Sequence, residues 1–367
     1  MRKKVYQFKE YARNGLCTKS TAVSCPMTIN YILFSLVNTT SIFEETHFQF
    51  LWLLYGAHCI LVLASLFGNS VIIHIIRTDN SLKNATSYLI LSQACNDLVI
   101  TTTEMMDAIH YGSMNKMWFG GLFGQVTCKL CLVIIFCPAM VSIWILVTIA
   151  IERFYAVARP LRSSPVSNHL KKIIFLLWVS SFISSLPFLK KDNFQKIQES
   201  YYCNLADVLE DFTILKIVVV SLNVLLPLVI LLVMYTVVCL KLWSREVPGE
   251  GFNQNAQQAE AMKTARKITL MMIAVVVLYI VCWCPLFVVG ILLLSIGNFR
   301  VKGSFLLLLI WLTVAYSALN PYVYLMFSQK YRSGLKRVFK NCLGRCSIGK
   351  LNVLPLRAQR VEIDRQM

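Results

Sequence analysis

The sequence predicts an all-α membrane protein, a bundle of seven transmembrane helices followed by a short amphipathic helix. Three observations predict this fold class. The 367 residues are 57% hydrophobic and only 15% charged, whereas soluble proteins carry about 25% charged residues. The apolar residues gather in seven long runs, and Lys and Arg lie mostly in alternate connections between them. A chain with so little polar surface is expected in a lipid bilayer.

Each apolar run is long enough to cross the membrane. Crossing ~30 Å of hydrocarbon takes about 20 helical residues, and backbone polar groups in lipid must be paired within the segment, which favours helices. The predicted spans are 51–76, 87–109, 124–151, 172–189, 212–241, 266–295 and 304–327. Residues 51–327 are therefore predicted to form one transmembrane domain.

The basic residues of the connections indicate the orientation. Most of the Lys and Arg face the cytoplasm if the N-terminal segment, residues 1–50, is extracellular and the tail, residues 341–367, is cytoplasmic. The basic start of the chain argues the other way. A sequon at Asn38 predicts glycosylation of the N-terminal segment. We expect a multi-pass plasma membrane protein. The net charge of +18 does not indicate nucleic-acid binding, because the basic residues form no single patch.

A second kind of helix is predicted after the seventh span. Residues 328–340 alternate apolar side chains such as Tyr331 and Phe339 with Lys and Arg, a pattern typical of an amphipathic helix on the anionic inner leaflet. Cys342 and Cys346 follow and are candidates for palmitoylation; unmodified thiols are the alternative.

The 13 cysteines do not predict a metal centre. Most lie within apolar runs, where Cys behaves as a small hydrophobic residue, and no paired C-x-x-C spacing typical of zinc sites is present. Cys128 begins the third span and Cys203 lies between the fourth and fifth spans, so both face the oxidising side. We predict a disulfide between them.

Polar residues occur within spans where lipid alone would not tolerate them. Asp97 lies in the middle of the second span, Asn69 in the first and Asn320 in the seventh. Buried polar groups need partners, so these residues are expected to meet inside the bundle. A sodium ion or a water cluster would complete the coordination of Asp97, and this ion is the one metal or cofactor we expect. The alternative is a hydrogen-bonded cluster that packs helices.

The third span ends in an acid–base pair, Glu152-Arg153. A charge costs several kcal/mol inside lipid, so this pair marks the inner boundary of the membrane. Pro227, Pro285 and Pro321 interrupt the last three spans, and proline removes a backbone hydrogen bond and kinks a helix. The kinks favour a bundle that switches between two arrangements.

Two acids lie near the outer end of the second span. Glu104 and Asp107 are three residues apart and therefore share one helix face. They could receive a cationic group of a ligand that arrives from outside. The alternative is a water-exposed helix end, where acids cost little.

Together these motifs resemble those of the rhodopsin-like (class A) G-protein-coupled receptors. The resemblance covers residues 50–346, nearly all of the membrane portion. Each motif alone is weak, but their order over seven spans is specific. The matching residues are Gly68-Asn69, Asp97, Cys128, Glu152-Arg153-Phe154, Trp178, Pro227, Tyr235, Cys282-Trp283-Cys284-Pro285 and Asn320-Pro321-Tyr322-Val323-Tyr324.

The resemblance implies roles for these residues. Asp97, Ser142 and Asn320 would form a sodium and water pocket, with Gln93 standing nearby where the family usually has Leu. Trp283 would be the aromatic toggle beneath the ligand.

At the inner end, the resemblance implies that Arg153 holds the inactive state and later meets the G protein. Tyr235 and Tyr324 would swing inward to support it. Ala265 stands where many members carry an acid, so Glu152 is expected to be the main restraint on Arg153. The implied partners are a heterotrimeric G protein and arrestin, and the implied activity is guanine-nucleotide exchange without covalent chemistry. The chain is not expected to be an enzyme.

Departures from the family pattern narrow the ligand. Ile135 occupies the position where amine receptors carry Asp, and Val314 the position of the retinal lysine in opsins. A neuropeptide is therefore the expected extracellular ligand, contacting the Glu104, Asp107, Ile135 and Trp283 region. A small amine bound by Glu104 or Asp107 is the alternative. A transporter or channel is the third hypothesis, but the chain shows no inverted repeat typical of transporters.

Overall fold

The computed structural model describes residues 41–112, 118–159, 162–188, 194–197, 200–203, 213–244, 253–295 and 303–351. Several predicted features lie outside the described residues. They are the Asn38 sequon, the tail from residue 352, and the side chains of Asp107, Ile135, Cys203, Cys342 and Cys346.

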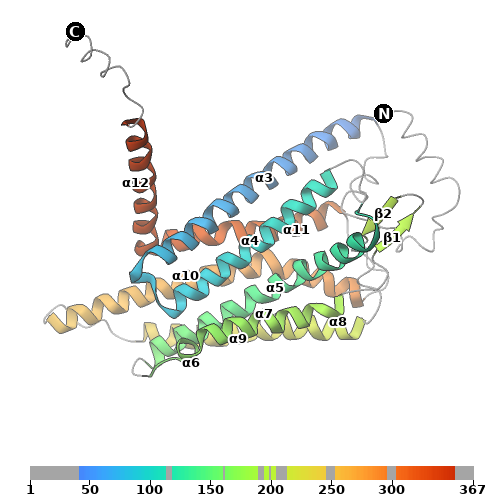
Figure 1. Cartoon of the computed structure of the whole chain (residues 1–367). Coiled ribbons are helices and arrows are strands. Elements are labelled where there is room, and N and C mark those ends of the chain that lie inside the picture. Colours follow the sequence, from blue (N-terminus) through green and yellow to red (C-terminus); the bar gives the residue numbers. More distant parts are fainter. Residues whose placement is uncertain are drawn as a thin grey trace, which may run out of the picture.

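Seven long helical segments lie side by side in the described chain (Figure 1). They are α3 (Ser41–Thr78), α4 (Ala85–Gly112), α5 (Gly121–Ala158), α7 (Leu170–Ser185), α8 (Thr213–Val220) continued by α9 (Leu226–Trp243), α10 (Asn253–Ser295) and α11 (Gly303–Phe327). The helices α3, α4, α5 and α7 pack in succession, α9 packs on α5, α10 packs on α8, α9 and α11, and α11 contacts both α10 and α3. This last contact closes the bundle.

Two helices differ from their predicted spans. The helix α7 ends at Ser185, before the predicted limit at residue 189, and gives way to a 3₁₀ turn, Leu186–Phe188. Pro187 explains the early end, because a proline has no backbone N–H to donate to the carbonyl four residues earlier. The helix α10 begins at Asn253, well before the predicted residue 266, so its polar first turns extend beyond the apolar run.

The bundle is apolar outside and partly polar inside. Large side chains on its outer surface stay exposed, including Leu63, Phe175 and Met326. Its interior buries polar groups on α3, α4, α5 and α11 together with aliphatic residues such as Ile143 and Ile145. Lipid is as apolar as a leucine side chain, so it rewards this distribution where water would not.

Length and hydropathy alone identify four helices in the described residues that could cross a membrane. They are Gly56–Thr78, Phe136–Ala158, Ile217–Trp243 and Ala259–Leu292. The helix α7 has only 16 residues, and α4 carries Asn96, Asp97 and Glu104 within its apolar run. Both helices pack in the same bundle as the other spans. This packing supports their assignment as membrane spans, which their own hydropathy indicates less strongly.

The fifth span is interrupted before its proline. A π-helical segment, Ser221–Leu225, separates α8 from α9, and Pro227 lies in the first turn of α9. The wide turn brings Asn223 to face α5, where its Oδ1 accepts a hydrogen bond from Trp144 Nε1 at 3.2 Å. Pro285 and Pro321 lie inside α10 and α11, and Pro138 lies inside α5. The sequence analysis did not single out Pro138.

A pair of β-strands, which the sequence analysis did not predict, lies at one end of the bundle (Figure 1). Strands β1 (Phe194–Ile197) and β2 (Ser200–Cys203) pair antiparallel with Phe194 opposite Cys203. The backbone N–H of Trp118 donates to the carbonyl of Tyr201 at 2.7 Å, which fixes the hairpin to the chain just before α5.

The last helix, α12 (Gln329–Leu351), begins at the expected place and runs beyond residue 340. Figure 1 shows it leaving the bundle at a steep angle, at the end opposite the hairpin. Its first turns contact the end of α3: Arg337 Nη2 lies 3.2 Å from Asp79 Oδ2. A Cβ atom on the buried Gly334 would lie 2.5 Å from Ile75 Cγ2, so only glycine allows this close approach.

Candidate functional site

Asp97 of α4 is fully buried and accepts hydrogen bonds from two helices. Asn320 Nδ2 of α11 donates to Asp97 Oδ2 at 2.9 Å, and Ser317 Oγ donates to Oδ1 at 3.4 Å. Gln93 Nε2, one turn earlier in α4, donates to Oδ1 at 3.0 Å. A carboxylate out of reach of water requires such donors, and here they tie α4 to α11.

Gln93 also connects this carboxylate to α5. The same Nε2 lies 3.0 Å from Ser142 Oγ and 3.3 Å from Tyr316 Oη. The three residues of the predicted sodium and water pocket therefore lie together. Asp97 contacts Asn320 directly and is linked to Ser142 through Gln93. Sequence analysis noted Gln93 only as a departure from the family. Its spacing of four residues from Asp97, which puts both on one helix face, was the available signal.

Asn96 supplies a second link from α4 to α5. Its Nδ2 donates to Ser142 Oγ at 2.8 Å and to the carbonyl of Pro138 at 3.0 Å. That carbonyl lies at the proline-containing turn of α5. Two neighbouring amides of α4 thus both bind Ser142, and the network joins α4, α5 and α11.

Asn69 extends the polar interior to α3. Its Nδ2 donates to the carbonyl of Ser317 on α11 at 3.0 Å and to the carbonyl of Ser65 at 3.0 Å. The hydroxyl of Ser65 lies 2.6 Å from Thr101 Oγ1 on α4. A Cβ atom on Gly68 would lie 3.0 Å from Pro321, so glycine lets α3 lie against the proline turn of α11.

An aromatic stack lies in α10 beside this network. The Trp283 ring centroid is 5.7 Å from that of Phe287 and 6.1 Å from that of Tyr279, in stacked geometry. Tyr316 of α11 meets Tyr279 edge to face at 5.5 Å. Trp283 Nε1 and the Tyr279 hydroxyl are buried with no hydrogen-bond partner in the described part of the chain. The stack therefore fixes ring positions mainly by packing, and the switch role implied for Trp283 stays a prediction.

At the inner end of α5, Arg153 has a different partner from the expected one. Its Nη2 donates to Thr86 Oγ1, in the first turn of α4. Glu152 Oε1 instead accepts from Ser167 Oγ at 3.0 Å, and no hydrogen bond between Glu152 and Arg153 is found among the described residues. The sequence motifs had not singled out Thr86 as a partner of Arg153. In this structure the hydrogen-bond partner of Arg153 is thus Thr86, and the restraint expected from Glu152 stays a prediction.

The two tyrosines expected to support Arg153 are buried near the inner end of the bundle. Tyr235 lies in α9 and Tyr324 in α11. Neither hydroxyl has a hydrogen-bond partner within the described residues, and the Tyr324 ring lies 6.1 Å from that of Tyr331 on α12. In this structure neither tyrosine binds Arg153, an arrangement compatible with an inward swing on activation.

The outer end of α5 is held by covalent and polar contacts. Cys128 is buried and disulfide-bonded. The predicted partner, Cys203, ends strand β2, and its side chain lies outside the described residues. Trp118 Nε1 donates to the carbonyl of Gly124 at 3.0 Å and to Thr127 Oγ1 at 3.1 Å. These contacts fix the chain before α5 to its first two turns.

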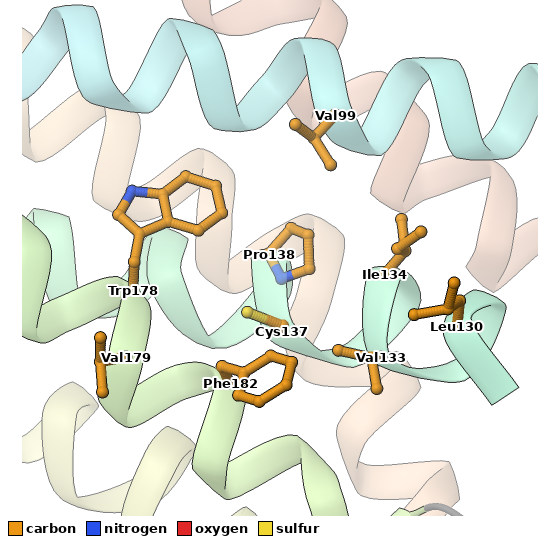
Figure 2. A pocket seen from close by; sticks show the side chains of 9 residues that line it. All are labelled: Val99, Leu130, Val133, Ile134, Cys137, Pro138, Trp178, Val179 and Phe182. Atoms are coloured by element: carbon orange, nitrogen blue, oxygen red, sulfur yellow. The ribbon is translucent and has the colours of Figure 1, made fainter.

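Of the predicted ligand-binding residues, Glu104 is half-buried on α4, and Trp283 lies in the stack described above. The side chains of the other two predicted ligand-binding residues, Asp107 and Ile135, lie outside the described residues. A cavity of ≈ 430 Å³ lies instead between α4, α5 and α7 (Figure 2). Its lining is wholly apolar, and the exposed Phe182 and Ile134 place its opening on the lipid-facing surface.

The sequence is similar to those of several peptide receptors. The neuromedin-K receptor of Oryctolagus cuniculus is 26% identical over 334 residues, which cover 89% of this chain and 68% of the relative. The substance-P receptor of Rattus norvegicus is 27% identical, with 78% and 70% covered. The tachykinin-like peptides receptor 99D of Drosophila melanogaster is 24% identical, with 80% and 58% covered.

A family model described as "7 transmembrane receptor (rhodopsin family)" matches residues 68–324. The match confirms the predicted fold class, a helical seven-transmembrane bundle, and the predicted class of protein. The family consists of signalling receptors of the plasma membrane that cross it several times, and it is not an enzyme family. Since the matched residues include the Asp97 network, Arg153 and the aromatic stack and make up more than half of the 367 residues, this chain belongs to the rhodopsin family of seven-transmembrane receptors.

Proposed function

We propose that this protein is a G-protein-coupled receptor for an extracellular neuropeptide of the tachykinin kind. Ligand binding would drive guanine-nucleotide exchange on a heterotrimeric G protein. The observation that carries the proposal is the set of relatives, whose names include neuromedin-K, substance-P and tachykinin-like peptide receptors. Ile135, standing where amine receptors carry Asp, supports a peptide over a monoamine.

The geometry supports a switching mechanism for this function. The Asp97 network and the Trp283 stack lie between the outer end and Arg153, and they involve helices with proline-containing turns. A ligand shifts such a bundle only by binding one arrangement better than the other. We place the ligand at the outer end, near Glu104, and the G protein at the inner end, near Arg153, with arrestin as a second inner partner.

The membrane orientation belongs to the same proposal. Lys and Arg in alternate connections support an extracellular N-terminus and a cytoplasmic tail. The disulfide at Cys128 supports an oxidising environment at that end of α5, and we propose Cys203 as its partner. Glycosylation at Asn38 and palmitoylation at Cys342 and Cys346 would follow from this orientation.

The decisive experiment expresses the full chain and measures nucleotide exchange on a panel of G proteins. Tachykinin peptides, other amidated neuropeptides and monoamines are added in turn. A response to a peptide that Arg153→Ala abolishes at normal surface expression supports the proposal. A response to monoamines alone, lost in Glu104→Gln, would favour the small-amine alternative and contradict the peptide proposal.

A further inference from the structure

The oxygen atoms of Asp97 are surrounded by hydrogen-bond donors. Asn320 Nδ2 lies 2.9 Å from Oδ2, while Gln93 Nε2 and Ser317 Oγ lie 3.0 Å and 3.4 Å from Oδ1. A hard cation such as sodium needs oxygen acceptors in its coordination shell. An amide nitrogen has no lone pair to offer a cation, so the Gln93 and Asn320 nitrogens do not fit as sodium ligands.

Of the other two oxygens in the predicted pocket, Asn320 Oδ1 is buried without a hydrogen-bond partner among the described residues, whereas Ser142 Oγ is committed. Ser142 Oγ accepts from Gln93 Nε2 at 3.0 Å and from Asn96 Nδ2 at 2.8 Å. The Gln93 amide thus lies between Asp97 Oδ1 and Ser142 Oγ and contacts both. That is the place a cation bridging the carboxylate and the hydroxyl would need.

The orientation of the Gln93 amide follows from the charges around it. Turning the amide over would bring its Oε1 to 3.0 Å from Asp97 Oδ1. Two acceptors at that distance, one of them a carboxylate, repel each other, and burial strengthens the repulsion. The nitrogen therefore faces Asp97. The side chain is fully buried, so it cannot swing aside into solvent.

From this geometry we propose that Gln93 replaces the sodium ion that the resemblance to the family implies, and that the Asp97 pocket is closed to sodium. A cation entering the pocket would have to displace an amide nitrogen that lies within 3.3 Å of Asp97 on α4, Ser142 on α5 and Tyr316 on α11. Since an ion that binds neither arrangement shifts no equilibrium, the receptor is insensitive to sodium. The polar residues around Asp97 then form a hydrogen-bonded cluster that packs helices, which is the alternative to a sodium site that the sequence left open.

The test measures the melting temperature of the purified full-length receptor in nanodiscs. Sodium chloride is exchanged for N-methylglucamine chloride at constant ionic strength, so that only the cation changes. The wild-type melting temperature should stay the same within about 1 °C. The Gln93→Leu substitution frees the carboxylate, so the melting temperature of that variant should rise by about 2–4 °C in sodium. No peptide ligand is needed, so the result is independent of the proposed neuropeptide function.

Two further variants keep the test sharp. Gln93→Glu has the same shape but replaces the donor nitrogen by an acceptor oxygen, and it should also gain a sodium-dependent shift even if Gln93→Leu folds poorly. Asn96→Leu is the matched control: it removes an amide bound to Ser142 but leaves Gln93 on Asp97, so no shift is expected. The proposal is overturned if sodium raises the melting temperature of the wild type or of Asn96→Leu. It is also overturned if sodium leaves the melting temperatures of both Gln93 variants unchanged.

Discussion

At the scale of single residues, the inner end of α5 is restrained by a contact between helices. Arg153 Nη2 binds Thr86 Oγ1 of α4, and Glu152 binds Ser167 beyond the end of α5. Glu152 is adjacent to Arg153 in sequence, but the two side chains leave the helix in different directions. In this structure Arg153 is therefore held by a hydrogen bond to Thr86 and not by one to Glu152.

We expect Thr86→Val to raise ligand-independent nucleotide exchange by about an order of magnitude. The substitution keeps the side-chain shape and removes the hydroxyl, and a hydrogen bond to a charged group contributes about 1.5–3 kcal/mol. Glu152→Gln should raise the basal rate less, because the carboxylate of Glu152 makes no hydrogen bond to Arg153 in this structure. Basal exchange is measured in membranes and normalised to surface expression.

Thr102→Val is the matched control for Thr86→Val. Thr102 lies on the same helix and is exposed, and its hydroxyl donates to the carbonyls of Leu98 and Val99 in its own helix. Its basal rate should equal that of the wild type. If Thr86→Val stays at the wild-type rate while Glu152→Gln rises, the sequence-based expectation of a Glu152 restraint is right and the one from the structure is wrong.

At the scale of elements, the contact between α12 and α3 depends on a glycine and an ion pair. Gly334 lies against Ile75, Arg337 pairs with Asp79, and Lys330 Nζ lies 3.4 Å from the carbonyl of Ser81. The backbone N–H of Ser81 lowers the pKa of Asp79 below its ordinary value, and Arg337 lowers it further. An acid with a lowered pKa contributes its stabilisation above the ordinary pKa and loses it as the pH falls through the lowered one. The ion pair therefore persists at neutral pH.

Gly334→Leu should release α12 from α3. The added side chain would overlap Ile75, and overpacking of this kind costs about 1–3 kcal/mol. Hydrogen exchange over residues 329–340 should become faster, and coupling to the G protein should weaken. Ser333→Leu adds the same side chain at an exposed neighbouring position and should leave hydrogen exchange over residues 329–340 unchanged. Equal protection in both variants would contradict the docking contact.

At the scale of the whole molecule, polarity is arranged for lipid. Apolar side chains cover the outside, while Asp97, Gln93 and Asn320 are hidden where the helices meet. Neither lipid nor bulk water can supply partners for these residues, and Asp97 finds them within α4, at Gln93, and on α11, at Asn320. The same network that permits these residues to be buried also sets which helices are neighbours.

A charge on the lipid-facing surface should therefore be costly. Leu232 lies near the middle of the fifth span and is 59% exposed. We expect Leu232→Arg to destabilise the inserted protein by about 3 kcal/mol and to reduce surface expression. Ser244→Arg, just after α9 at the membrane boundary, is the control and should express normally. Normal expression of Leu232→Arg would show that this face does not contact lipid.

The sequence by itself determined that this protein lies in a lipid bilayer, and it determined the order of its helices. Seven apolar runs and the rarity of charge require a lipid environment, since the cost of burying backbone and charge in lipid acts on each segment separately. For the same reason Asp97 was predicted to need partners inside the bundle. The motif set from Asn69 to Tyr324 then sufficed to predict the receptor family.

Only the tertiary structure decided which polar residues meet. Thr86 and Arg153 are 67 positions apart, and Gln93 and Tyr316 are 223 apart, so their contacts depend on how each helix is rotated about its axis. No local pattern encodes that rotation. The paired strands at residues 194–197 and 200–203 were missed, and their contact with Trp118, through Tyr201, joins residues far apart in the sequence. Distant contacts of this kind decide that Arg153 binds Thr86 and that Gln93, one turn before Asp97, lies between Asp97 and Ser142.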